Sequence, residues 1–139
     1  MATPIILCGK FEQVGQVVKN TIQPEFEVVH FISSPESGQT TIPLLVKGEA
    51  PTNSSDNIGS RNYAVASKAV VVGAMYDDAW VENLAKEVDV PVLRPERLVG
   101  NPTGPPDAAA VQAVAKRVKE GLQKLVDEGK LGQAGVFWY

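Results

Sequence analysis

A β-α-β pattern near the start of the chain constrains the fold more than any other feature of the sequence. An apolar run from Ile5 to Cys8 ends at Gly9, and apolar residues at helical spacing follow over Phe11 to Ile22. A second apolar run then covers Val28 to Ile32. Continuous hydrophobic runs are typical of parallel strands that are buried on both faces. The turn after such a strand sets the positive end of the next helix at the carboxyl edge of the sheet, where we expect any ligand to bind.

The rest of the chain continues the alternation of strands and helices. After the first strand we expect strands over residues 27–32, 69–72 and 90–93, with helices over 11–22, 39–47, 79–88 and 107–128. Such an alternation predicts an α/β fold, a three-layer α/β/α sandwich with right-handed crossovers. We expect a parallel sheet of four to five strands in the order 2-1-3-4.

Length and composition predict one soluble domain over residues 1–139. The chain is 44% hydrophobic and 21% charged, which is close to globular averages. A net charge of -3 argues against nucleic acid as a partner, because binding phosphates requires clustered Lys and Arg. No stretch is long and apolar enough for a membrane span, and the single Cys8 cannot form an internal disulfide. We therefore expect a cytoplasmic protein without membrane contacts.

The first turn carries a glycine pattern that is known from one protein family. Gly9 and Gly15 enclose the segment KFEQV, and over residues 4–34 the chain resembles the Rossmann NAD(P)-binding family, less specifically over 69–93. It also resembles small single-domain Rossmann-like proteins of fungi in the Gly9-Lys10 turn, the segment YDD and the aromatic end. These resemblances imply a Rossmann/flavodoxin-like sheet and NAD(P) as the cofactor to test. The middle glycine of the family pattern is absent here, and Phe11 or Glu12 stands in its place.

The strand ends predict a binding site for a small molecule, either nucleotide-like or another anionic metabolite. Backbone donors and the Lys10 ammonium would bind its negative charge, and the loop over residues 53–63 would cover it. The residues expected to line this crevice, at the carboxyl ends of the first three strands, are Gly9, Lys10, Ser33, Ser34, Gly73, Ala74 and Tyr76.

Two alternatives belong to other functional classes. The first is a homodimeric interaction protein without a cofactor, suggested by the incomplete glycine pattern and by the apolar end from Gly135 to Tyr139, which should dock as an edge strand or at a dimer contact. The second is a cofactor-independent lyase or isomerase that uses His30 with Asp77 or Asp78 as acid and base. Each of these residues also has a structural explanation, His30 as a packed residue and the aspartates as helix caps. The sequence shows no metal-ligand cluster.

Overall fold

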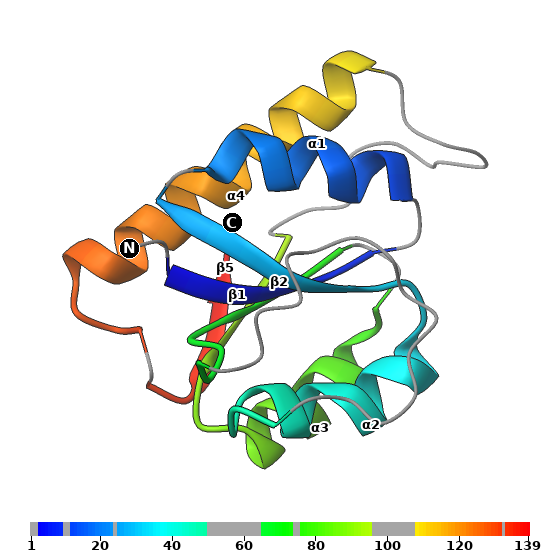
Figure 1. Ribbon diagram of the computed structural model, residues 1–139, viewed down its shortest axis with the longest axis vertical. Coiled ribbons are helices and arrows are strands. Elements are labelled where there is room, and N and C mark those ends of the chain that lie inside the picture. The colour runs from blue at the N-terminus through cyan, green and yellow to red at the C-terminus, as the bar shows by residue number, and fades with distance from the viewer. Residues whose placement is uncertain are drawn as a thin grey trace.

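A five-stranded, all-parallel sheet in the order β2-β1-β3-β4-β5 forms the centre of the molecule (Figure 1). The computed structural model describes residues 3–9, 12–23, 25–49, 65–73, 76–95, 108–131 and 133–139. Its elements are β1 (Thr3–Cys8), α1 (Glu12–Ile22), β2 (Phe26–Ile32), α2 (Pro35–Leu45), β3 (Val70–Val72), α3 (Asp78–Glu87), β4 (Pro91–Arg94), α4 (Ala108–Asp127) and β5 (Gly135–Trp138). The α/β class and the strand order predicted from the sequence are confirmed, and the aromatic end forms the fifth strand.

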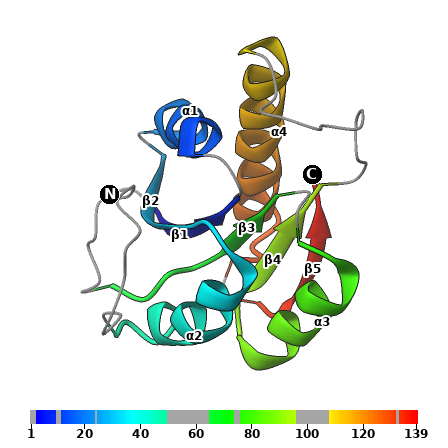
Figure 2. The same ribbon diagram turned by 90° about the vertical axis from the view of Figure 1, so that its right-hand side faces the viewer.

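The sheet has a separate hydrophobic core on each of its two faces. In β1, Ile5 and Leu7 join the core under α1 and α4, whereas Ile6 and Cys8 join the core above α2 and α3. Figure 2 shows these helix pairs on opposite sides of the sheet. Burial of alternate residues on both faces explains why β1 reads as an uninterrupted apolar run. No helix in the described ranges is long and apolar enough to cross a membrane.

The connection from β4 to β5 departs from the expected handedness. The crossovers through α1, α2 and α3 are right-handed, and α3 advances the chain from β3 to β4 on the face opposite α1. The next crossover advances in the same direction, but α4 lies on the α1 face (Figure 2). It is therefore left-handed, whereas about 98% of such crossovers are right-handed. The expectation of uniformly right-handed crossovers is wrong at β5, where packing of α4 against α1 determines the face.

An irregularity in β2 decides which of its side chains face each core. Ile5 is paired with Val28 but Ile6 with His30, so Val29 is an extra residue in the parallel pairing. The bulge resets the alternation, and Phe31 thereby joins Val28 in the core beneath α1. Without it, His30 would share the face of Val28.

Gly15 allows α1 to lie directly on the ring of Phe31. A Cβ atom at Gly15 would lie 2.6 Å from Cε1 and 2.7 Å from Cδ1 of Phe31. Gly38 of α2 approaches Trp80 in the same way. A Cβ atom added to Gly38 would lie 2.8 Å from Cζ2 of Trp80. The close approach of helix and strand expected at Gly15 is therefore observed, and an aromatic ring is its cause.

We predict that Gly15→Ala destabilises the fold by about 1–3 kcal/mol, because the added methyl overpacks against Phe31. Alanine in a helix interior otherwise stabilises relative to glycine, so the sign of the change is diagnostic. Urea unfolding of Gly15→Ala, of Phe31→Leu and of the double variant measures the coupling. Gln16→Ala, at an exposed position of α1, is the control and should change stability little. A more stable Gly15→Ala variant would contradict the contact.

Candidate functional site

The turns after β1, β2 and β3 meet at the carboxyl edge of the sheet, as the sequence predicts. The Gly9 N–H donates to the Ile32 carbonyl at 2.9 Å, and the Gly73 N–H donates to the Cys8 carbonyl at 2.9 Å. Gly73 also lies against Gly9, since a Cβ atom added to Gly73 would be 3.7 Å from Gly9 Cα. These two main-chain donors are therefore engaged by strand-end carbonyls. Lys10 and Ala74 of the predicted site lie outside the described residues.

Tyr76, which was expected to line the crevice, lies across this edge. The residue follows β3, yet its hydroxyl donates to the Ile32 carbonyl at 3.2 Å and approaches the Gly9 carbonyl at 3.5 Å. Its ring packs on the Trp80 ring in a tilted arrangement, with centroids 4.6 Å apart and an angle of 52° between the planes, and only 3% of the residue is exposed. Tyr76 thus links the turn after β3 to the ends of β1 and β2. It acts here as a buried structural contact.

The two serines after β2 have different environments. Ser34 is the N-cap of α2, and its Oγ accepts a hydrogen bond from the Ser37 N–H at 3.2 Å. Ser33 is exposed at the edge. The Ser34 hydroxyl therefore caps α2, and Ser33 is the exposed serine of the pair.

Carboxylates lie at the starts of all three helices that follow β1, β2 and β3. Glu12, Glu36 and Asp78 stand in the first turns of α1, α2 and α3. Asp77 is the N-cap of α3, where its Oδ1 accepts from the Trp80 N–H at 2.8 Å. Negative charge at these positions interacts favourably with the helix dipoles and repels a second anion. These carboxylates would repel an anionic ligand, while Asp78 is paired with Arg94 and Lys10 lies outside the described residues.

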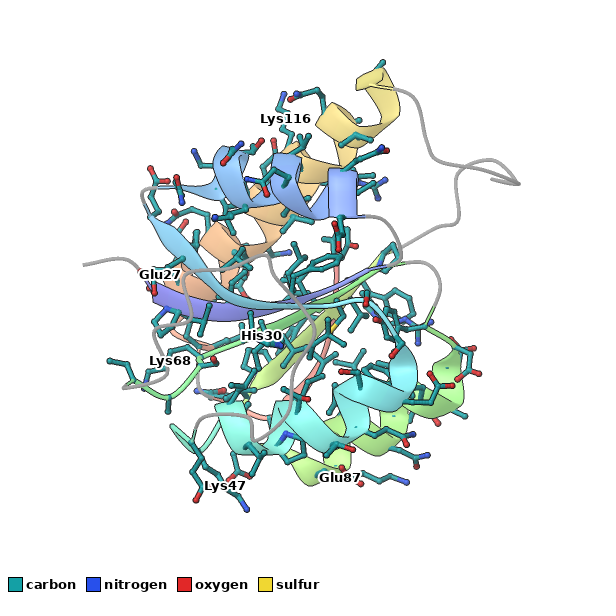
Figure 3. The ribbon with its side chains drawn as sticks, turned by 45° about the vertical axis from the view of Figure 1, so that its right-hand side comes forward. Glu27, His30, Lys47, Lys68, Glu87 and Lys116 are labelled. Carbon is teal, nitrogen blue, oxygen red and sulfur yellow. The ribbon has the colours of Figure 1, made fainter. Side chains whose placement is uncertain are left out.

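The structure separates His30 from the two aspartates. His30 is 1% exposed, lies beside Ile6 within the sheet and faces α2 (Figure 3). Asp77 and Asp78 are exposed at the start of α3, and Asp78 forms an ion pair with Arg94 of β4. An acid and base pair formed by His30 with either aspartate would need one shared pocket. His30 is thus buried in β2 while both aspartates are exposed at the start of α3, and among the described residues no three His, Cys, Asp or Glu side chains could hold a metal ion.

Arg94 and Trp138 form a cluster at the ends of β4 and β5 that sequence reasoning did not assemble. The Arg94 guanidinium pairs with Asp78 and lies 4.5 Å from the centroid of the Trp138 ring. Its Nε is buried without a hydrogen-bond partner, whereas Trp138 is 55% exposed. The available signal was an arginine directly after an apolar run and a tryptophan in the aromatic end. Only the pairing of β4 with β5 brings them together.

Tyr139 anchors β5 to the sheet. Its N–H donates to the Arg94 carbonyl at 2.9 Å, and its hydroxyl donates to the Val72 carbonyl at 2.8 Å. The Arg117 guanidinium of α4 donates to the Tyr139 main-chain oxygen at 3.0 Å. Burial raises the pKa of the Tyr139 phenol, so the hydroxyl stays a donor over the physiological range.

The outer edge of β5 is the exposed strand edge of the sheet. Because the Tyr139 N–H points towards β4 and bonding direction alternates along a strand, the N–H and C=O groups of Val136 and Trp138 point away from β4. A groove of about 330 Å³ runs beside this edge. Its lining includes Phe137 and Trp138 of β5 and Lys124 and Glu128 near the end of α4.

Comparison with known proteins gives one fungal relative. No family model and no solved structure matches the chain. Kojic acid related protein 6 of Aspergillus oryzae is 31% identical over 132 residues, which cover 91% of this chain and 79% of the relative. The similarity extends over nearly the whole domain, and its fungal source agrees with the resemblance seen in the sequence.

We predict that Tyr76→Phe lowers the free energy of unfolding by about 0.5–1.5 kcal/mol, because the Ile32 and Gly9 carbonyls lose their hydroxyl donor. The packing of the ring on Trp80 should survive. Thr21→Val is the control, since the Thr21 hydroxyl donates only within α1, to the Val17 carbonyl at 2.8 Å. Denaturant unfolding measures both variants. Unchanged stability of Tyr76→Phe would show that the hydroxyl does not hold the edge closed.

Proposed function

The chain belongs to the same family as Kojic acid related protein 6, and we propose that it is a protein-interaction domain that binds an extended strand at the outer edge of β5. The observation that carries the proposal is the outward direction of the Val136 and Trp138 main-chain groups, next to an exposed Trp138 ring. An edge of this kind can add a further strand through main-chain hydrogen bonds. The name of the relative connects that protein with kojic acid, and an interaction protein can serve such a role without catalysing a reaction.

The remaining edge of the sheet is less suited to adding a strand. The residues of β2 are buried except Glu27, which is half-buried. By contrast, every residue of β5 is at least partly exposed. The exposed side chains and outward main-chain groups therefore occur together at β5.

The closed carboxyl edge gives indirect support to an interaction role. Tyr76 lies across the ends of β1 and β2, and the Gly9 and Gly73 N–H groups bond to neighbouring strands. Among the described residues of these turns, the Gly9 and Gly73 N–H groups are thus already bonded within the protein. Acidic first turns further weaken the case for a phosphate-bearing ligand.

We expect a labelled peptide with the sequence of residues 133–139 to bind the protein as an added strand. Val136→Pro should weaken that binding by at least about tenfold, roughly 1.4 kcal/mol, because proline removes an outward N–H and its ring blocks the edge. The pairing with β4 does not use this N–H, so the fold should persist. Fluorescence anisotropy measures the binding.

Val126→Lys provides a matched control for the peptide experiment. Val126 is 40% exposed on α4 and is absent from the lining of the β5 groove. The control should leave peptide affinity unchanged. Equal binding to the wild type and to a folded Val136→Pro variant would refute strand addition at β5.

A second candidate function is the binding of a small anionic molecule at the carboxyl edge. One observation favours it: Gly9, Gly73 and Tyr76 lie close together at the ends of β1 and β3, which are neighbours in the sheet. In open α/β sheets with this strand order, ligands bind outside that junction. The positive charge for such a ligand would come from Lys10.

For this second candidate, Lys10→Glu should abolish binding of any nucleotide or acidic metabolite that stabilises the protein. A thermal-shift panel with NAD(P), nucleotides and carboxylic acids identifies the compound, and the variant is then tested with it. Lys19→Glu, a charge reversal on the outer part of α1, is the control. A compound that stabilises the wild type and Lys10→Glu equally would exclude Lys10 from the site.

A further inference from the structure

Resting on the proposed function, we infer that the strand bound by β5 is the β5 of a second copy, paired antiparallel with the two Phe137 residues facing each other on a twofold axis. The two sheets would then become one continuous sheet. We choose a second copy as the partner because the β5 edge is complementary to itself. An antiparallel copy of β5 presents an outward C=O opposite each outward N–H.

The positions of the outward groups determine the register. In an antiparallel pair, two residues that face each other with outward groups exchange both of their N–H···O=C bonds. Placing Val136 opposite Trp138 of the partner gives every outward group of both residues a bond. A twofold axis at Val136 would instead pair Trp138 with residue 134, which lies before the first residue of β5. The axis at Phe137 is therefore the register that uses the whole strand.

The side chains on the two faces suit this register. Val136 packs on the core beneath α3, and Trp138 lies on Arg94, so the α3 face would place each Trp138 beside the Val136 of the other copy. On the opposite face, Phe137 would meet Phe137 of the partner. An aromatic residue is a favourable cross-strand neighbour both of a β-branched residue and of another aromatic residue. The exposed Trp138 ring would become covered.

Two cations beside β5 are paired within each copy. Arg94 is paired with Asp78, and the Lys130 ammonium lies 2.8 Å from the Glu128 carboxylate. These pairs reduce the repulsion between two copies, and Lys124 of the groove lining is a further cation that salt would screen.

A closed dimer is also favoured over an open chain of molecules. Growth of a filament would require the β5 edge of one copy to pair with the β2 edge of the next. The β2 residues other than Glu27 are buried, so β2 is poorly placed to accept that strand. Pairing of β5 with β5 uses both exposed edges and ends growth.

Cysteine cross-linking tests the register directly. Two facing residues that exchange hydrogen bonds have Cα atoms about 5.5 Å apart, which is within the range of a disulfide. Val136 of one copy and Val136 of the other would be diagonal neighbours, and their Cα atoms would lie further apart. A mixture of Val136→Cys and Trp138→Cys proteins should therefore oxidise to a cross-linked heterodimer, and each variant alone should give little dimer. The native Cys8 is 1% exposed and serves as the wild-type background.

The oligomeric state of the wild type separates this inference from the proposed function. Sedimentation at increasing concentration should reveal a species of twice the 14.9 kDa chain mass, with slowed amide exchange at Val136 and Trp138. This exchange measurement needs no variant, so misfolding of a cysteine variant does not block the test. A monomeric protein that still binds the strand peptide would overturn the dimer and leave strand addition standing. Self-linking of Val136→Cys alone would overturn the register, and absence of both dimer and peptide binding would overturn both proposals.

Discussion

The contact of Phe31 with Gly15 and Gly9 determines what the first β-α-β unit can do. A Cβ atom at Gly9 would lie 3.3 Å from Phe31 Cε1, and one at Gly15 would lie closer still. In a dinucleotide site, the first glycine of this pattern forms the tight turn, the middle one lets the backbone approach a pyrophosphate, and the last one allows close packing of helix and strand. Here the space beside both glycines is taken by an aromatic ring of the protein itself. The unit is therefore a β-α-β element whose two glycines both pack against Phe31.

The same kind of contact recurs wherever a helix lies close to the sheet or to another helix. The Trp80 ring packs on Gly38 of α2. A Cβ atom added to Gly121 of α4 would lie 3.1 Å from the Cβ of Tyr139. Trp80 in turn supports Tyr76, whose hydroxyl reaches the ends of β1 and β2. The aromatic side chains thus connect both helical layers to the carboxyl edge. Closing of that edge follows from packing on both faces of the sheet.

Hydrophobic runs and helical spacing allowed the strands and the helices to be predicted, because both signals are local. The order of the first four strands was predicted from their alternation with helices. The Ser34 cap was missed as a helix start, and the expected helix at 39–47 begins instead at Pro35, where proline fits the first turn. The bulge at Val29 and the left hand of the last crossover depend on contacts between distant segments. The same holds for Tyr76, since nothing in its neighbours along the chain indicates that its hydroxyl ends 44 residues away at Ile32.

Arg94 couples the two regions that bear on function. Its guanidinium contacts Asp78 at the start of α3 and the Trp138 ring on β5, while its main-chain carbonyl accepts from Tyr139. The Asp78 side chain is 80% exposed, so water screens its attraction to the guanidinium. The Arg94 Nε is buried without a hydrogen-bond partner, and this burial costs free energy that the contacts with Asp78 and Trp138 offset. Arg94 thus links the start of α3 to β5, and a strand added at β5 would cover the Trp138 side of this cluster.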